Sequence, residues 1–399
     1  MVTLHQDPEF DAQLGRTIIA AHCEAGDIGE AIAVGGTVAP GDHAGWFDAW
    51  ARAAERAGER GEAALAGGHR ATARQAFLRA SEYWRQAIFF VRSDLDDARL
   101  QRGWRAHRAA FRQAVPLMAH EVVTAEIPFP RGGSMTTYLC RAHGAGDAPR
   151  PVVVMPCGYD STAEAGYVAT GYMALRRGMD ALLFEGPGQG GMLYEHRVPM
   201  APDFEAALAP VLDWLLARPD VDPARVSMIG RSFAGYLAPR AAAEDHRVRA
   251  LVCDPGQFDF VSRMVPGQID EATWQRVLAA DPEVDARLEA MRAGPGKAEW
   301  WGARMATMGA TSVGDFLRMQ PGYTLEGRAE RIACPTLVTE GEGDFASQGR
   351  ELMDHLTCEK RFVAFSAAEG AGGHCEGLGA ALFEGRVFDW LQEVLPGPA

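Results

Sequence analysis

The sequence has no hydrophobic stretch long enough to cross a bilayer. Its first eleven residues, M-V-T-L-H-Q-D-P-E-F-D, lack the basic and hydrophobic regions of a signal peptide. No C-x-x-C pair occurs among its seven cysteines, which are Cys23, Cys140, Cys157, Cys253, Cys334, Cys358 and Cys375. An odd number of isolated cysteines is typical of reduced thiols. We therefore expect a cytoplasmic protein that neither spans nor binds a membrane.

Basic residues are in the minority and are scattered along the chain. Lys and Arg total 39 against 53 Asp and Glu, which gives a formal net charge of −14. This distribution argues against nucleic acid and anionic membranes as partners. The sequence contains no cluster of metal ligands and no cofactor motif, so we expect neither a metal nor a cofactor. The G-P-G-Q-G segment at 186–190 lacks the spacing of a phosphate-binding loop, and we interpret it as a turn at the rim of a pocket.

Residues 1–118 have the pattern of packed helices. The clearest stretch lies between His69 and Val91, where apolar residues recur every three or four positions. We interpret the whole segment as an N-terminal helical cap domain. Aromatic rings at this spacing usually pack between helices, although one or two of them could cover an active site.

Residues 119–399 alternate between strand and helix patterns, which predicts a catalytic domain. Two alternating runs, 121–130 and 135–142, flank the turn R-G-G-S and predict a β-hairpin. Six short apolar runs follow, separated by helical segments: 151–156, 180–185, 225–230, 249–254, 335–340 and 361–366. Such strands indicate an α/β protein with a mostly parallel sheet and helices on both faces. The strand count is that of an α/β-hydrolase fold, and the long interval at about 256–330 predicts a helical lid insertion.

Ser232 is the centre of the predicted site. The strand that ends at Gly230 is followed almost directly by a helix that starts near Phe233. Ser232 therefore lies on a tight turn, with the small residues Gly230 and Ala234 two positions away on either side. This is the pattern of the nucleophile elbow in α/β-hydrolases. The alternative is a serine that caps an ordinary strand-to-helix turn.

A nucleophilic serine needs a base to take its proton and an acid to orient that base. In this fold the acid and then the histidine follow the serine in the chain, each on a loop after a strand. Asp344 follows the strand before the last and is the candidate acid, and His374 follows the last strand and is the candidate base. Three other carboxylates remain alternatives for the acid: Glu340, Glu342 and Asp254.

Two backbone N–H groups are candidates for an oxyanion hole. One belongs to Phe233, the residue directly after the nucleophile. The other belongs to Tyr159, in the loop after strand 151–156, where Gly158 allows a close approach. A plain turn that caps the next helix is compatible with this role.

Four segments carry a resemblance to a known branch of α/β-hydrolases: G-Y-D-S-T at 158–162, F-E-G-P-G-Q-G at 184–190, Y-L-A-P-R-A-A-A at 236–243 and G-A-G-G-H-C-E at 370–376. The chain resembles the branch that contains 2,6-dihydroxypseudooxynicotine hydrolase and the fungal naphthopyrone (heptaketide) hydrolases that shorten polyketides. The resemblance implies Ser232 as nucleophile, Asp344 as acid and His374 as base. It also implies a helical cap, a homodimer, and hydrolysis of a carbon–carbon bond in a β-diketone or aryl ketone.

The leading hypothesis is a serine hydrolase that forms an acyl-enzyme and cleaves a carbon–carbon bond in a polyketide-like small molecule. Such cleavage requires a stabilised leaving carbanion, for example an enolate, which His374 would protonate. The same site would cleave an ester more easily, so an esterase, lactonase, thioesterase or acyltransferase acting on a natural product is the alternative. A second alternative is a non-catalytic protein that binds ligands with a hydrolase fold, against which the intact Ser, Asp and His argue.

Overall fold

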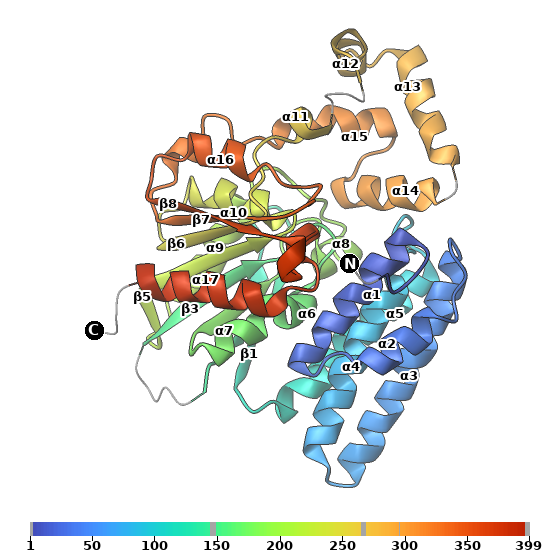
Figure 1. The fold of residues 1–399 in the computed structure, drawn as a ribbon, viewed down its shortest axis with the longest axis vertical. Helices are drawn as coiled ribbons and strands as arrows, with labels where there is room; N and C mark the ends of the chain where they lie inside the picture. The colour runs from blue at the N-terminus through green and yellow to red at the C-terminus, as the bar shows by residue number, and fades with distance from the viewer. Residues whose placement is uncertain (1–2, 144–148, 265–268, 295, 396–399) are drawn as a thin grey trace.

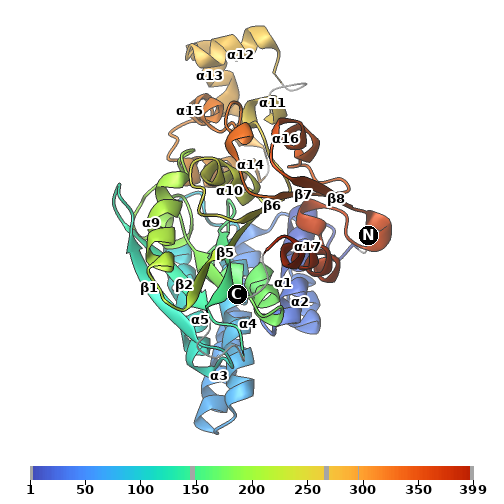
Figure 2. The same cartoon turned by 90° about the vertical axis from the view of Figure 1, so that its left-hand side faces the viewer.

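The computed structural model describes residues 3–143, 149–264, 269–294 and 296–395. An eight-stranded sheet forms its centre, with helices on both faces and two further helical regions to one side (Figures 1 and 2). The strands are β1 (Val122–Pro128), β2 (Ser134–Cys140), β3 (Arg150–Pro156), β4 (Asp180–Phe184), β5 (Val221–Arg231), β6 (Ala250–Asp254), β7 (Thr336–Gly341) and β8 (Lys360–Phe365). Their order is β1-β2-β4-β3-β5-β6-β7-β8, with β2 antiparallel to β1 and β4 and all other neighbours parallel. The predicted α/β-hydrolase fold is confirmed.

The sheet has a hydrophobic core on each face, which explains why its strands are continuously apolar. Side chains of β3 alternate between the two cores, with Val152 and Val154 in one and Val153 and Met155 in the other. The first core is completed by α9 (Glu205–Leu216), α10 (Ala234–Ala242) and α16 (Gly349–His355). The second is completed by α6 (Ala163–Gly166), α7 (Tyr172–Arg176) and α17 (Ala380–Val394). Between α6 and α7 the helix is interrupted by a π-helical turn, Tyr167–Gly171.

Five helices precede the sheet: α1 (Pro8–Ile19), α2 (Ile28–Gly35), α3 (His43–Ala66), α4 (Arg70–Ile88) and α5 (Ala98–Ala114). Four of them begin directly after an aspartate whose side chain accepts backbone N–H groups of the first turn: Asp7, Asp27, Asp42 and Asp97. Their own core contains fully buried Trp46, Trp50 and Trp104. The helices also join the core of the sheet, because Phe111 of α5 packs on Tyr138 of β2 with ring centroids 5.2 Å apart.

The second helical region lies between β6 and β7. It contains α11 (Phe260–Met264), α12 (Glu271–Leu278), α13 (Pro282–Glu289), α14 (Lys297–Met308) and α15 (Val313–Met319). Residues 265–268 and 295 of the predicted lid lie outside the described part of the chain. Figure 1 shows α14 beside the N-terminal helices, and Glu299 at its start accepts the backbone N–H of Arg92 at 2.6 Å. Among the described residues, no helix has the length and hydrophobicity needed to cross a membrane.

Candidate active site

Ser232 lies on the turn between β5 and α10, in a left-handed backbone conformation with φ of 58°. A Cβ atom at Gly230 would lie 2.1 Å from the carbonyl oxygen of Ala234, so only glycine fits there. A Cβ atom at Gly235 would lie 2.0 Å from the carbonyl oxygen of Pro255. The second close approach of this elbow is thus at residue 235, which explains why alanine is tolerated at 234.

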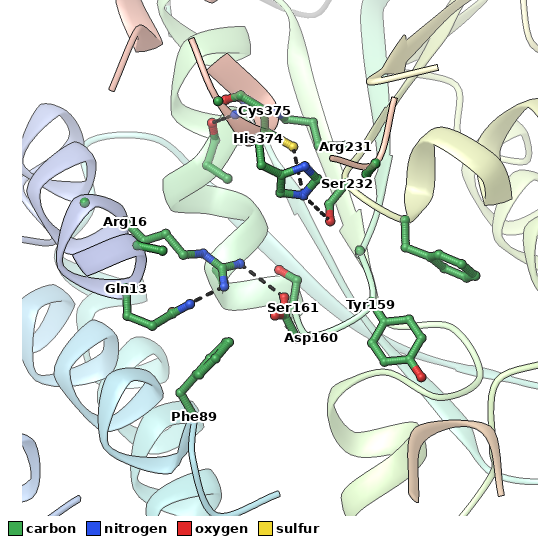
Figure 3. A pocket seen from close by; sticks show the side chains of 18 of the residues that line it. Gln13, Arg16, Phe89, Tyr159, Asp160, Ser161, Arg231, Ser232, His374 and Cys375 are labelled. Atoms are coloured by element: carbon green, nitrogen blue, oxygen red, sulfur yellow. Dashed lines mark hydrogen bonds and ion pairs between the residues drawn. The ribbon is translucent and has the colours of Figure 1, made fainter. Parts of the chain in front are cut away.

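The structure brings the three predicted catalytic residues into one hydrogen-bonded chain, of which Figure 3 shows the link between His374 and Ser232. The Nε2 atom of His374 lies 2.9 Å from Oγ of Ser232, and its Nδ1 atom lies 2.9 Å from Oδ1 of Asp344. The Asp344 carboxylate is fully buried, whereas the imidazole is 31% exposed. Backbone N–H groups of Ala346 and Cys375 also donate to this carboxylate, at 2.8 and 3.1 Å. These hydrogen bonds hold the carboxylate in position beside His374.

The other candidate acids have different partners. Asp254 accepts from Nε of Arg231 at 2.5 Å and from Oγ1 of Thr339 at 2.8 Å. Glu340 accepts from the hydroxyl of Ser347, and Glu342 from the backbone N–H of Ala367. Among the described carboxylates, only that of Asp344 is hydrogen-bonded to His374.

The loop that carries His374 has an unusual backbone. Gly373, Cys375, Glu376 and Gly377 all have positive φ, between 49° and 91°. Arg231, next to the nucleophile, stabilises this loop by donating to the carbonyl oxygen of Cys375 at 2.8 Å and to the Glu376 carboxylate at 3.0 Å. The elbow and the histidine loop are therefore tied together by one guanidinium group. The strain of such a loop is tolerated because several contacts fix its conformation.

The environment of His374 changes its basicity. Burial lowers the pKa of its imidazole, but the neighbouring Cys375 sulfur and the hydrogen bond to Asp344 outweigh burial and raise the pKa above its ordinary value. The Cys375 Sγ atom lies 3.6 Å from Nε2 of His374. The interactions that raise this pKa also stabilise the imidazolium ion that forms when the histidine takes a proton from Ser232.

The two candidate oxyanion donors flank the nucleophile. Gly158 approaches so closely that a Cβ atom there would lie 3.2 Å from Cβ of Ser232. The rings of Tyr159 and Phe233 pack edge to face, with centroids 5.3 Å apart. Neither backbone N–H has a hydrogen-bond acceptor among the described residues. Both donors are therefore available to an oxygen bound beside Ser232.

The G-P-G-Q-G segment does not have the predicted position at the pocket rim. Its residues are buried and do not contribute to the cavity wall in the described part of the chain. Instead, the Gln189 side chain donates to the carbonyl oxygen of Cys157 at 2.6 Å. This hydrogen bond fixes the loop that carries Tyr159 from the interior of the protein. The prediction was wrong because a glycine-rich turn can support a site loop from the interior as well as border it.

Ser232, His374 and Tyr159 line a cavity of about 1560 Å³. Its wall combines the sheet edge with the N-terminal helices and the region between β6 and β7. Phe89 and Phe90, at the end of α4, belong to the wall, as the aromatic pattern allowed. The described residues contain no group of three or more His, Cys, Asp or Glu side chains that could hold a metal.

Sequence reasoning missed the charged residues of the wall, among them Arg16, Arg92, Asp160 and Arg304. Arg16 reaches from α1 to Asp160 at 3.2 Å (Figure 3). An arginine on an amphipathic helix has the same local pattern whether it faces solvent or a cavity, so only the position of α1 and α14 at the cavity identifies Arg16 and Arg304. The Y-D-S-T motif was the one available signal for Asp160.

Comparisons with known proteins agree with this architecture. Residues 36–262 match the family model described as "Esterase FrsA-like". The chain is 31% identical to the hydrolase acrC of Aspergillus aculeatus, over 96% of each protein. It is 28% identical to the 20-hydroxy-prefusarin hydrolase FUS2 of Gibberella moniliformis, over 96% of this chain and 95% of that one. Among solved structures, 2,6-dihydroxy-pseudo-oxynicotine hydrolase has a TM-score of 0.74 at 23% identity, covering 96% of this chain and 98% of its own.

Proposed function

The chain belongs to the FrsA-like esterase family of α/β hydrolases, and we propose that it is a serine hydrolase with Ser232 as nucleophile, His374 as general base and Asp344 as the orienting acid. The single observation that supports this most strongly is the hydrogen-bonded chain from Ser232 through His374 to Asp344 on the wall of a large cavity. A cavity of about 1560 Å³ has room for a ligand larger than most drug-sized molecules.

The mechanism follows from the positions of these groups. His374 takes the proton of Ser232 while Oγ attacks the substrate carbonyl carbon, and the N–H groups of Tyr159 and Phe233 bind the resulting oxyanion. When the tetrahedral intermediate collapses, the bond to the leaving group breaks and His374 returns the proton to that group. Water then attacks the acyl-enzyme with the same histidine as base, releases a carboxylic acid and restores Ser232.

We further propose that the scissile bond is the carbon–carbon bond of a β-diketone or aryl ketone. The support is the resemblance to the branch that contains 2,6-dihydroxypseudooxynicotine hydrolase, together with the relatives from fungi named as hydrolases. In this reaction the leaving group is an enolate, and the proton that His374 took from Ser232 goes to its carbon. The raised pKa of His374 favours a histidine that holds this proton until the enolate forms.

A carboxylic ester, thioester or lactone is the second candidate substrate. It is favoured by the family description, which names an esterase and covers residues 36–262. The same residues would act in the same roles, and the leaving group would be protonated on oxygen or sulfur.

Two measurements test these proposals. A fluorophosphonate probe should label the wild-type protein and fail to label Ser232→Ala; absence of labelling in both would support a ligand-binding protein instead. Purified protein should then be given an aryl β-diketone and an aryl ester of matched size. Cleavage of the ester with no turnover of the diketone would contradict the carbon–carbon assignment and leave the esterase.

The proposed assembly is a homodimer that acts on a small molecule, an inference that depends on the resemblance alone. Sedimentation of the purified protein would test it directly. A single species at the mass of one chain, 43.0 kDa, would contradict it.

A further inference from the structure

Most charged side chains of the cavity wall are neutralised by neighbours. Arg16 pairs with Asp160 at 3.2 Å, and Arg85 pairs with Glu82 at 2.6 Å. Arg231 pairs with Asp254 and Glu376 beneath the nucleophile.

Wall acids outside these pairs are Glu9, Asp11 and Glu299. Asp11 accepts backbone N–H groups of Leu4 and His5, Glu299 accepts those of Arg92 and Ser93, and Glu9 is at the exposed edge.

Arg92 and Arg304 are different, because neither guanidinium forms an ion pair with a carboxylate in the described part of the chain. Arg92 donates to the carbonyl oxygen of Phe89 at 2.8 Å and lies 4.2 Å from the centroid of the Phe89 ring. Arg304 donates to the carbonyl oxygen of Trp300 at 3.0 Å and stacks on the Trp300 indole at 3.5 Å. Arg92 also forms a hydrogen bond with Tyr194, and its charge acts on the Asp160 carboxylate. Each guanidinium has five N–H donors, so further donors remain available on both.

The two arginines come from different parts of the chain and meet at the junction of the N-terminal helices with α14. Glu299 fixes this junction by accepting the backbone N–H of Arg92. The junction is also connected to the predicted oxyanion loop, since the Tyr159 hydroxyl donates to the carbonyl oxygen of Arg304 at 2.9 Å. Both guanidinium groups therefore face the same cavity as Ser232 and His374.

The surroundings of Arg304 lower the basicity of its guanidinium group. Burial is the largest cause, and together with the positive charge of Arg92 it lowers the pKa of Arg304 to about 10, against the opposing effects of Tyr159, Asp160 and Glu9. The group remains a cation at neutral pH. An unpaired cation in a partly dehydrated site is stabilised strongly by an anion of suitable geometry.

We propose that Arg304 and Arg92 form a subsite for an anionic oxygen group of the substrate, in the simplest case a carboxylate, which is remote from the bond that is cleaved. Guanidinium groups match carboxylate oxygens in geometry as well as charge, and stacking on Trp300 and Phe89 holds both in place. The identification of the ligand as substrate rests on the proposed hydrolase function. The existence of the subsite does not.

A matched pair of esters tests the subsite during turnover. The substrates are para-nitrophenyl hydrogen glutarate, which carries a free carboxylate, and its neutral methyl ester. Wild-type protein should prefer the anionic ester, and Arg304→Gln should raise KM for that ester about tenfold or more, the usual loss for a hydrogen bond to a charged group. The same variant should raise KM for the methyl ester much less than for the anionic ester, and a wild-type circular dichroism spectrum would show that it is folded.

Two further variants sharpen the result. Arg304→Lys keeps the charge and should retain part of the preference for the anionic ester. Arg276→Gln on α12 removes a guanidinium that pairs with Asp281 and Glu283 away from the cavity, and should behave as wild type with both esters. An equal loss on both esters in Arg304→Gln, or no preference in wild type, would overturn the subsite.

A binding measurement separates this proposal from the proposed function. Calorimetry on Ser232→Ala protein would use glutaric acid mono-para-nitroanilide and its methyl ester. The acid should bind at least about tenfold more tightly than the ester, and Arg304→Gln in the same background should abolish the difference. If neither ester is hydrolysed and no fluorophosphonate label appears, the hydrolase proposal fails. The difference in affinity between the acid and its methyl ester still tests whether the subsite exists. Equal binding of both compounds would overturn it.

Discussion

Asp344 and Asp254 are both buried carboxylates at the ends of neighbouring strands, but their partners differ. Asp344 is bonded to His374 at 2.9 Å, and Asp254 to Arg231 at 2.5 Å. We expect Asp344→Asn to lower kcat by about 10³–10⁴-fold with little loss of stability, because the amide favours the wrong histidine tautomer. Steady-state kinetics and thermal unfolding of the same preparation would measure both effects.

Asp254→Asn is the matched comparison. It removes one of the two carboxylates that neutralise Arg231, so we expect a lower unfolding temperature and a much smaller loss of kcat than in Asp344→Asn. The assignment of the acid would be wrong if Asp254→Asn were inactive while Asp344→Asn turned over normally.

Cys375 provides a prediction about pH. Its sulfur raises the pKa of His374, and a general base must be deprotonated to accept a proton. Activity should therefore increase as pH rises through the pKa of His374. Cys375→Ala removes one cause of the raised value, so the midpoint of the acidic limb of kcat/KM should move to lower pH. An unchanged midpoint, measured with the wild-type and variant proteins in the same buffers, would contradict this account of the histidine.

At the scale of elements, the turn between β5 and α10 depends on space for the backbone of the next loop. Gly235→Ala would place a Cβ atom 2.0 Å from the carbonyl oxygen of Pro255, so we expect a loss of about 1–3 kcal/mol or more in the free energy of unfolding. Gly58→Ala in α3 is the control, since a Cβ atom there meets no other atom within 4 Å. That change should stabilise the protein by about 0.5–1 kcal/mol. Similar effects of both substitutions on chemical denaturation would be evidence against the close approach.

Elements with strong periodicity could be predicted from the sequence, and those determined by tertiary contacts could not. The strands of the parallel sheet were predictable because burial on both faces makes them continuously apolar, as in β3 and β4. The π-helical turn at Tyr167–Gly171 was not, because an irregular turn has no local apolar pattern.

The order of Ser232, Asp344 and His374 predicted their grouping, since loops after parallel strands lie at one sheet edge. Arg92 and Arg304 could not be predicted, because their meeting depends on how α14 packs on the N-terminal helices.

At the scale of the whole molecule, the N-terminal helices and the sheet share a core. Phe77 and Phe111 of the helices belong to the same buried cluster as Tyr138 and Val153 of the strands. Arg108 of α5 also pairs with buried Glu185 at 2.5 Å. A chain of residues 119–399 alone would expose this apolar surface and leave Glu185 unpaired, so we expect it to aggregate.

Gel filtration and circular dichroism of the 119–399 chain, beside the full chain, would measure this outcome. A monomeric, folded product that still reacts with a fluorophosphonate would show instead that the predicted boundary at residue 118 separates independent domains.

The cavity wall has a practical consequence for finding the natural substrate. Arg16, Arg92 and Arg304 come from three segments that are far apart in the chain, and an occupant of the cavity would bridge them. A ligand that binds only this assembled wall stabilises the folded protein by about 2.7 kcal/mol at a concentration one hundred times its Kd. The melting temperature of the protein rises as a result. Thermal-shift screening of Ser232→Ala protein, in which the compound is not consumed, can therefore rank candidate metabolites before any reaction assay exists.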